Sequence, residues 1–274
     1  MSQFPIPRFS PYVQRAPYGG GRAVADSTNR ELAKISRQAP RIPWDAFLRD
    51  WFTWRNEDDD GEHVSLLGNT GGGKTHLMRQ ILPLHPFVTI FATKPRDRSM
   101  DAFLSEGYYR IEEWQKLSPM EYPRRVLWPK VRSIDAFDAM RETFRTALHR
   151  IYAEGAWTVA TDELLMMTSE FKLDREYRML YTQGRSLGIS MVSATQRPRN
   201  VPLETYSQAT HLFLWKQTDQ YDLQRLSEIG GIDSSLLKSV VPLLAQHEVL
   251  YCCTKTGAVC RTKAPPPTKP TKEK

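Results

Sequence analysis

The sequence predicts an α/β protein in which a mainly parallel central sheet is flanked by helices and followed by a C-terminal β-hairpin. Short apolar segments alternate with segments of helical spacing, which is the pattern of strands joined by helices. Most apolar segments are uninterrupted, as in parallel strands buried on both faces. The expected strands are 64–67, 87–92, 125–128, 157–161, 189–194 and 211–215, and the expected helices are 74–82, 134–152, 175–187, 220–229 and 234–244. Residues 248–253 and 258–262 flank Lys255-Thr256-Gly257, which predicts the hairpin.

The composition is that of an ordinary globular protein. The chain has 274 residues, a mean hydropathy of −0.51 and no apolar run near the length of about 18 residues that a membrane span needs. The first 15 residues are polar and broken by proline, unlike a secretory signal. These features exclude an integral membrane protein, a collagen-like fibre and a fully disordered chain, so we expect no membrane insertion.

The positive charge is concentrated at the two ends of the chain. Residues 1–45 and 261–274 each carry a net charge of +4, and the segment between them carries −1. Basic tails are typical of proteins that bind nucleic acid, although they also promote solubility. We expect an extended basic N-terminal arm at 1–42, one α/β domain at 43–263 and a disordered tail rich in proline and lysine at 264–274. Aromatic residues within 44–54 have near-helical spacing and are expected to pack on the main domain.

Three cysteines lie close together, at Cys252, Cys253 and Cys260. Their spacing does not match a zinc site, and their odd number without a signal sequence favours a reducing compartment. We expect them to be small buried apolar groups, with metal binding as the minor alternative.

A phosphate-binding loop is the most specific motif. Residues 68–75 match G-x-x-x-x-G-K-[ST] at every position, between an expected strand and an expected helix. Glycines let the backbone N–H groups approach phosphate oxygens, Lys74 reaches the β- and γ-phosphates, and the Thr75 hydroxyl binds Mg²⁺. The predicted ligands are therefore ATP and Mg²⁺, and a plain glycine-rich turn is the alternative. The predicted nucleotide-binding residues are Gly68, Asn69, Thr70, Gly71, Gly72, Gly73, Lys74, Thr75 and His76.

An acidic pair follows the expected strand 157–161. A carboxylate at the carboxyl end of a parallel strand lies in the ligand crevice of an α/β sheet. Asp162 is predicted to hold Mg²⁺ together with Thr75, and Glu163 to orient and deprotonate the attacking water. A base beside the metal-binding aspartate favours hydrolysis over transfer to a metabolite. Without the phosphate loop, a surface turn would explain the pair equally well.

Two later segments complete a family pattern. An Arg-x-x-Gly-Ile segment at 185–189 precedes a strand that ends in Ala-Thr-Gln-Arg-Pro at 194–198. With the phosphate loop and the Asp-Glu strand end, in this order, the chain resembles the FtsK/HerA superfamily of P-loop ATPases over residues 62–262. The resemblance implies a RecA-like fold. It also implies the activity of the family, whose members are motors that move DNA through hexameric rings. Only the compact members fit this length, which are the genome-packaging ATPases and short conjugative or mobile-element motors.

The resemblance also implies roles for single residues. Gln196 would be the sensor of the γ-phosphate, and Arg185 would be an arginine finger acting on the nucleotide of a neighbouring subunit. Arg178 is the rival finger. The simpler alternatives are a strand cap for Gln196 and a helix-terminal arginine for Arg185. The family often pairs an acidic residue with the lysine after its second strand, whereas here only Lys94 corresponds.

Double-stranded DNA is the expected partner, gripped through its phosphates without base-specific contacts. Each small basic cluster is explained equally well as a solvated surface. The candidate DNA-binding residues, besides Lys94, are Arg96, Arg98, Arg124, Arg125, Lys130, Arg132, Arg197 and Arg199.

The sequence therefore predicts an ATP-hydrolysing motor that translocates or packages double-stranded DNA as a ring. It would be cytoplasmic, or virion-associated if viral, with portal, capsid or transfer proteins as possible accessories. One alternative is an ATPase for protein export or phage morphogenesis. The other is a solitary P-loop nucleotide switch or kinase.

Overall fold

A nine-stranded sheet forms the centre of the protein. The computed structural model describes residues 38–54, 60–114, 118–130 and 133–266. The strand order is β3-β4-β2-β5-β6-β1-β7-β8-β9, and the first seven strands in this order run parallel. β8 and β9 are antiparallel and form the predicted C-terminal hairpin. The α/β, mainly parallel fold expected from the sequence is confirmed.

The strands agree closely with the sequence-based expectation. They are β1 (Val64–Leu67), β2 (Val88–Phe91), β3 (Tyr109–Ile111), β4 (Arg124–Leu127), β5 (Thr158–Thr161), β6 (Ser190–Thr195), β7 (His211–Leu214), β8 (Val249–Cys253) and β9 (Val259–Thr262). Only β3 was not predicted. It is a three-residue edge strand whose first two residues are exposed, so it has no apolar run to reveal it.

The predicted helices are also present, and most of them end in a 3₁₀ turn. The α-helices are α2 (Trp44–Ala46), α3 (Lys74–Ile81), α4 (Arg98–Ser105), α5 (Phe137–Glu154), α6 (Asp174–Gln183), α7 (Glu204–Ser207), α8 (Gln220–Leu226) and α9 (Ser234–Val240). The 3₁₀ turns are η3 (Leu82–Leu84), η4 (Ile134–Ala136), η6 (Gly184–Leu187), η7 (Pro198–Asn200) and η8 (Val241–Leu243), and the π turns are η1 (Phe47–Trp51) and η5 (Met166–Glu170).

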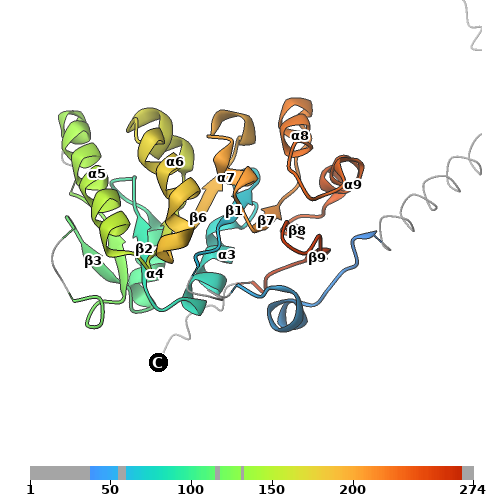
Figure 1. Cartoon of the computed structure of the whole chain (residues 1–274), viewed down its shortest axis with the longest axis horizontal. Helices are drawn as coiled ribbons and strands as arrows, with labels where there is room; N and C mark the ends of the chain where they lie inside the picture. The colour runs from blue at the N-terminus through green and yellow to red at the C-terminus, as the bar shows by residue number, and fades with distance from the viewer. Residues whose placement is uncertain (1–37, 55–59, 115–117, 131–132, 267–274) are drawn as a thin grey trace, which may run out of the picture.

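The helices cover the two faces of the sheet in separate layers. Helices α5 to α9 lie along one face, and α3, α4 and the N-terminal segment lie along the other (Figure 1). Each face has its own buried cluster, because successive residues of a strand point to opposite sides. In β1, Leu67 belongs to the cluster under α5 to α9, and Leu66 to the cluster over α3.

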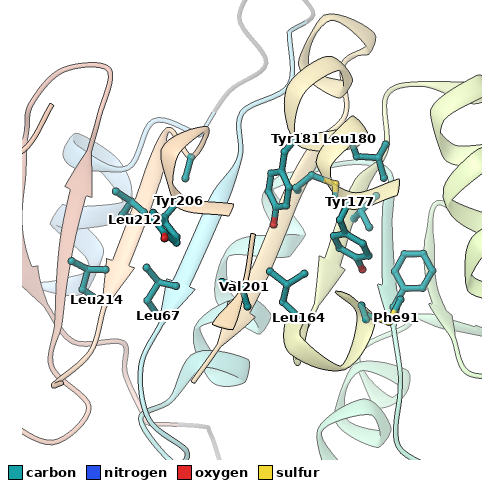
Figure 2. Packing of buried hydrophobic residues seen from close by; sticks show 14 of the residues in the cluster. Leu67, Phe91, Leu164, Tyr177, Leu180, Tyr181, Val201, Tyr206, Leu212 and Leu214 are labelled. Atoms are coloured by element: carbon teal, nitrogen blue, oxygen red, sulfur yellow. The ribbon is translucent and has the colours of Figure 1, made fainter. Parts of the chain in front are cut away.

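Figure 2 shows how the first cluster is filled. Tyr177, Leu180 and Tyr181 project from α6 toward the sheet, where they meet apolar side chains of the strands. The buried tyrosine hydroxyls have partners on the sheet, since the Tyr177 hydroxyl lies 2.7 Å from Thr161 Oγ1 and Tyr181 donates to Ser193 Oγ at 2.5 Å. These contacts fix α6 against the strands that carry the site.

The aromatic segment at 44–54 packs on the second face, as expected. Phe47, Phe52 and Trp54 are buried, and Phe47 lies edge-on to Tyr251 with ring centroids 4.9 Å apart. The segment just before it, which belongs to the expected arm, lies against β9. Ile42 N–H donates to Arg261 O at 2.8 Å, and Arg261 N–H donates to Pro40 O at 2.7 Å.

Further expectations concern the cysteines, metal binding and membrane spans. Cys252, Cys253 and Cys260 are free thiols buried in the core, as predicted. Among the described residues, no group of three potential ligands is arranged to hold a metal ion. Within the same ranges, no helix combines the length and apolar character that crossing a lipid bilayer requires.

Candidate functional site

The phosphate-binding loop joins the end of β1 to the start of α3 at the centre of the sheet. Gly68 N–H donates to Thr195 O of β6, which fixes the start of the loop. Gly71 and Gly73 have φ of +75° and +109°, a left-handed conformation that favours glycine. The buried Lys74 ammonium donates to Gly68 O at 2.6 Å and to Asn69 O at 3.0 Å. The loop therefore curls around its own lysine, as the motif predicts.

Trp215 supports the loop from the neighbouring strand. It lies at the end of β7 and is buried, and its backbone N–H donates to Leu67 O at 2.9 Å. A Cβ on Gly68 would meet Trp215 Cβ at 2.5 Å, so only glycine fits where the loop begins. The sequence motif identifies the glycine, but the tryptophan that requires it follows a different strand and was not predicted.

The hydroxyl and carboxylate predicted to bind Mg²⁺ are in contact. Thr75 Oγ1 donates to Asp162 Oδ1 at 2.7 Å, across the gap between α3 and the end of β5. A hydroxyl and a carboxylate oxygen are ligands that Mg²⁺ accepts, usually with water and phosphate oxygens completing its shell. The two residues therefore fit the ion that the motif implies.

Glu163 and Gln196 form a hydrogen-bonded chain with the phosphate loop. Gln196 Nε2 donates to Glu163 Oε2 at 2.9 Å, and Thr70 Oγ1 donates to Gln196 Oε1 at 2.7 Å. The three residues come from the end of β5, the end of β6 and the loop after β1. Gln196 thus connects the predicted general base with a side chain of the predicted phosphate-binding loop.

Burial changes the acidity of two site residues. It lowers the pKa of the Lys74 ammonium, and the nearby Asp162 and Glu163 carboxylates offset part of that effect. Burial also raises the pKa of the Glu163 carboxyl, against the hydrogen bond from Gln196 and the charge of Lys74. A carboxylate with a raised pKa is a stronger base, which suits a group that accepts a proton from water.

A further glutamine, not predicted from the sequence, contacts the predicted sensor Gln196. Gln217 is buried and donates from Nε2 to the backbone O of Gln196 at 3.3 Å. His247 Nδ1 lies 3.2 Å from Gly72 O, on the other side of the loop. Neither residue belongs to a local motif, because each reaches the site from the β7–β8 side of the sheet. His76 also takes part in a long-range contact, since its Nε2 lies against Pro265 O.

The two finger candidates lie away from this constellation. Arg185 precedes β6, at the amino edge of the parallel strands, whereas the phosphate loop lies at their carboxyl edge. Its side chain is exposed, and Nε donates to Gly61 O at 3.2 Å. Arg178 is half-exposed on α6 and forms ion pairs with Asp174 and Glu204. The structure brings neither arginine to the Lys74 site of its own chain.

One predicted DNA contact is wrong. Arg125 is only 1% exposed, and its guanidinium lies over the rings of Trp157 and Trp114, 4.7 and 5.1 Å from their centroids. Its Nε donates to Tyr122 O at 2.9 Å. The residue is a buried structural cation, and it cannot touch DNA without leaving the core.

The remaining basic candidates divide between the two edges of the sheet. Arg124 begins β4 at the amino edge and donates to Pro83 O. The others that the structure describes follow the carboxyl ends of β2, β4 and β6, on the same edge as the phosphate loop. They are Lys94, Arg96, Arg98, Lys130, Arg197 and Arg199. Arg132 lies outside the described residues.

Ion pairs occupy several of the cations at the carboxyl edge. Lys130 pairs with Glu112 at 2.6 Å, and Lys94 lies 3.6 Å from Asp97. Arg197 lies 3.6 Å from both Asp219 and Asp222. Arg96 and Arg199 are exposed, with Arg199 stacked over Tyr221. Phosphate contacts are therefore more accessible from Arg96 and Arg199 than from the paired cations.

Comparison with known proteins shows the same fold in viral and bacterial ATPases. Genome packaging NTPase B204 from Sulfolobus turreted icosahedral virus 2, in complex with AMPPCP, has a TM-score of 0.55 at 17% identity, over 76% of this chain and 99% of that chain. The DNA-packaging ATPase B204 from Sulfolobus turreted icosahedral virus has a TM-score of 0.54 at 19% identity, over 75% of this chain and 97% of that chain.

The cytoplasmic domain of the Thermomonospora curvata type VII secretion ATPase EccC is similar at a TM-score of 0.51 and 15% identity. That match covers 78% of this chain and 27% of that chain. No protein-family model matches the sequence, and the curated proteins contain no match either. At these identities the likeness establishes the fold. The RecA-like P-loop fold implied by the family resemblance is therefore confirmed.

Proposed function

We propose that this protein is an ATP-hydrolysing motor that translocates or packages double-stranded DNA as a ring, with six subunits as the family resemblance implies. The observation that carries the ATPase part is the chain Thr70–Gln196–Glu163 beside Lys74 and the Thr75–Asp162 pair. These contacts join phosphate-binding groups, a general base and a sensor in one place. A solitary switch or kinase would not need the glutamine that links the base to the loop.

The chemistry follows from the positions of these groups. Glu163 accepts a proton from the attacking water, whose oxygen forms a bond to the γ-phosphorus while the bond between that phosphorus and the β-phosphate oxygen breaks. The products are ADP and phosphate. Lys74 neutralises charge on the phosphates, for which it exchanges its present bonds to Gly68 O and Asn69 O. Gln196 holds the carboxylate of Glu163 in position.

Thr75 and Asp162 would hold Mg²⁺, which supplies positive charge to the β- and γ-phosphate oxygens when bound. Their contact at 2.7 Å supports a shared role for the hydroxyl and the carboxylate. Asp162 is only partly buried, so water can reach the same position.

The assembly part of the proposal is supported by the position of Arg185. The side chain is exposed on the edge of the sheet opposite its own phosphate loop, so as a finger it would have to act on the nucleotide of another subunit. Hydrolysis would then depend on assembly. The DNA part is supported by the exposed Arg96 and Arg199 and by the packaging ATPases that share the fold. The motor would work in the cytoplasm or the virion, with portal, capsid or transfer proteins as accessories.

Protein export is the second candidate, because a secretion ATPase shares the fold. Steady-state ATP hydrolysis against protein concentration, with and without linear duplex DNA at low salt, separates the alternatives. The DNA motor predicts turnover per subunit that rises with concentration and again with DNA. A rise with concentration alone would favour export. Turnover that ignores both would contradict the motor and favour a switch or kinase. Glu163→Gln is the control for contaminating ATPases.

A further inference from the structure

We infer that the adenosine part of ATP binds in a cavity beside the phosphate loop, and that the C-terminal residues 263–266 form one wall of it. This inference rests on the proposed ATPase function and adds the site of the base. The cavity has a volume of about 480 Å³. Typical pockets for small molecules have volumes of about 300 to 1,000 Å³, so this one has room for a nucleoside.

The cavity is continuous with the phosphate loop. Gly72, Gly73, Thr75 and His76 line it, and all four belong to the predicted nucleotide-binding set. A nucleotide whose phosphates lie along the loop must direct its ribose and base away from Lys74 and along α3. The cavity lies in that direction, since Leu77 and Arg79 of α3 also line it.

The walls have the chemistry that a flat heterocycle needs. Leu77 and Val249 are buried, and Trp215 is 4% exposed, so they provide an apolar surface against which a base can pack. Ala102 from α4 lines the cavity too, and Ser99 and Arg98 give it polar groups. An apolar wall with a few polar groups is the usual design of a small-molecule site. Arg98, first considered as a DNA contact, thus lies beside the nucleotide site.

The tail encloses the cavity from the outside. Ala264, Pro265 and Pro266 line it directly after β9, and Pro265 O receives a hydrogen bond from His76 Nε2. That contact joins the tail to the first turn of α3, one residue after the Mg²⁺-binding threonine. His76 Nδ1 is buried without a hydrogen-bond partner among the described residues. The tail is therefore attached to the start of α3, directly after the phosphate loop, by a polar contact.

A ligand beneath the tail would link nucleotide binding to the position of the C-terminal segment. The base would contact residues 264–266, whereas the triphosphate would contact the loop alone. Substitutions in the tail should therefore affect ATP and not a phosphate chain without a nucleoside. This difference distinguishes a base pocket from a general support of the loop.

The test is competition of ATP and of inorganic tripolyphosphate against a fluorescent ATP analogue bound to the full chain. Ala264→Trp places a large side chain in the cavity from the tail, and Ala102→Phe does so from α4. Each should weaken ATP binding by about tenfold or more and leave tripolyphosphate binding within about twofold. Ala153→Trp, on an exposed position of α5, is the matched control and should change neither.

Equal weakening of both ligands would overturn the inference, because it would mean that the tail only supports the phosphate loop. Unchanged ATP binding in both variants would overturn it too, since the base would then lie elsewhere. If the unmodified chain bound neither ATP nor tripolyphosphate, the proposed ATPase function itself would fail. Thermal unfolding of each variant shows whether a loss of binding reflects a loss of folding.

Discussion

Replacing Gln196 by methionine tests whether the hydrogen-bonded chain has a catalytic purpose. Methionine keeps the length of the side chain and removes both of its hydrogen bonds, at 2.9 Å to Glu163 and 2.7 Å from Thr70. A hydrogen bond to a charged group contributes about 1.5 to 3 kcal/mol. If that energy holds Glu163 in position during the reaction, its loss lowers kcat by about 10- to 150-fold.

The same substitution should shift the pH dependence of kcat. The hydrogen bond from Gln196 lowers the pKa of Glu163, and burial, the larger effect, raises it. Without Gln196, burial acts unopposed by that bond, so the pKa rises further. The base must be deprotonated to accept a proton, and the acid limb of the kcat–pH profile therefore moves to higher pH.

The assay is steady-state ATP hydrolysis from pH 5 to 9 at saturating ATP, in a range that brackets a carboxyl with a raised pKa. The KM for ATP should change by no more than about twofold, because the Gln196 side chain bonds to Glu163 and Thr70 and not to Lys74, which binds the phosphates. Gln208→Met, at an exposed position of the surface, is the matched control. An unchanged acid limb together with a kcat within about twofold of the parent would refute the role assigned to Gln196.

Three further predictions concern Glu163, Arg125 and Arg185. Glu163→Gln should bind ATP without turnover, as measured by nucleotide binding and by steady-state hydrolysis. A carboxyl with a raised pKa destabilises the fold as pH rises through that pKa, so the variant should also unfold at a higher temperature than the parent at pH 8 but not at pH 4. Arg125→Met should lower the free energy of unfolding in urea by about 2 kcal/mol, the size of a desolvated cation–π contact, and leave DNA affinity unchanged. Arg124→Met, at a half-exposed position, should keep the free energy of unfolding and weaken DNA binding, and intact stability of Arg125→Met would contradict its buried role. Arg185→Ala should be inactive alone and regain turnover when mixed with Lys74→Ala subunits, and no recovery in a mixed-subunit assay would argue against action between subunits.

The proposed catalytic groups could be located from the sequence because each belongs to a short local pattern. Lys74 and Thr75 belong to the phosphate-loop motif, and Glu163 and Gln196 each follow an apolar strand. Parallel strands bring their carboxyl ends to one edge of the sheet, so the fold class alone places these residues together. The helix α4 was missed because it is only eight residues long, although Asp97 accepts a hydrogen bond from Ser99 N–H as an N-cap.

The residues that the sequence did not reveal act across long distances in the chain. Trp215 and His247 contact the phosphate loop and Gln217 contacts Gln196, all from the β7–β8 side of the sheet, and no local spacing marks them. Arg125 shows the opposite error. Its charge suggested a surface, but the aromatic rings that enclose it lie at positions 114 and 157.

The pairing of residues 40–42 with β9 has a consequence for handling the protein. Edge strands carry unpaired N–H and C=O groups that can bind another chain. Here Pro40 O and the N–H of Ile42 occupy those groups at Arg261, and Arg41 pairs with Glu248. A shortened chain that starts at β1 would lose this cover, and its exposed β9 would offer a template for edge-to-edge aggregation, whatever happened to its nucleotide site.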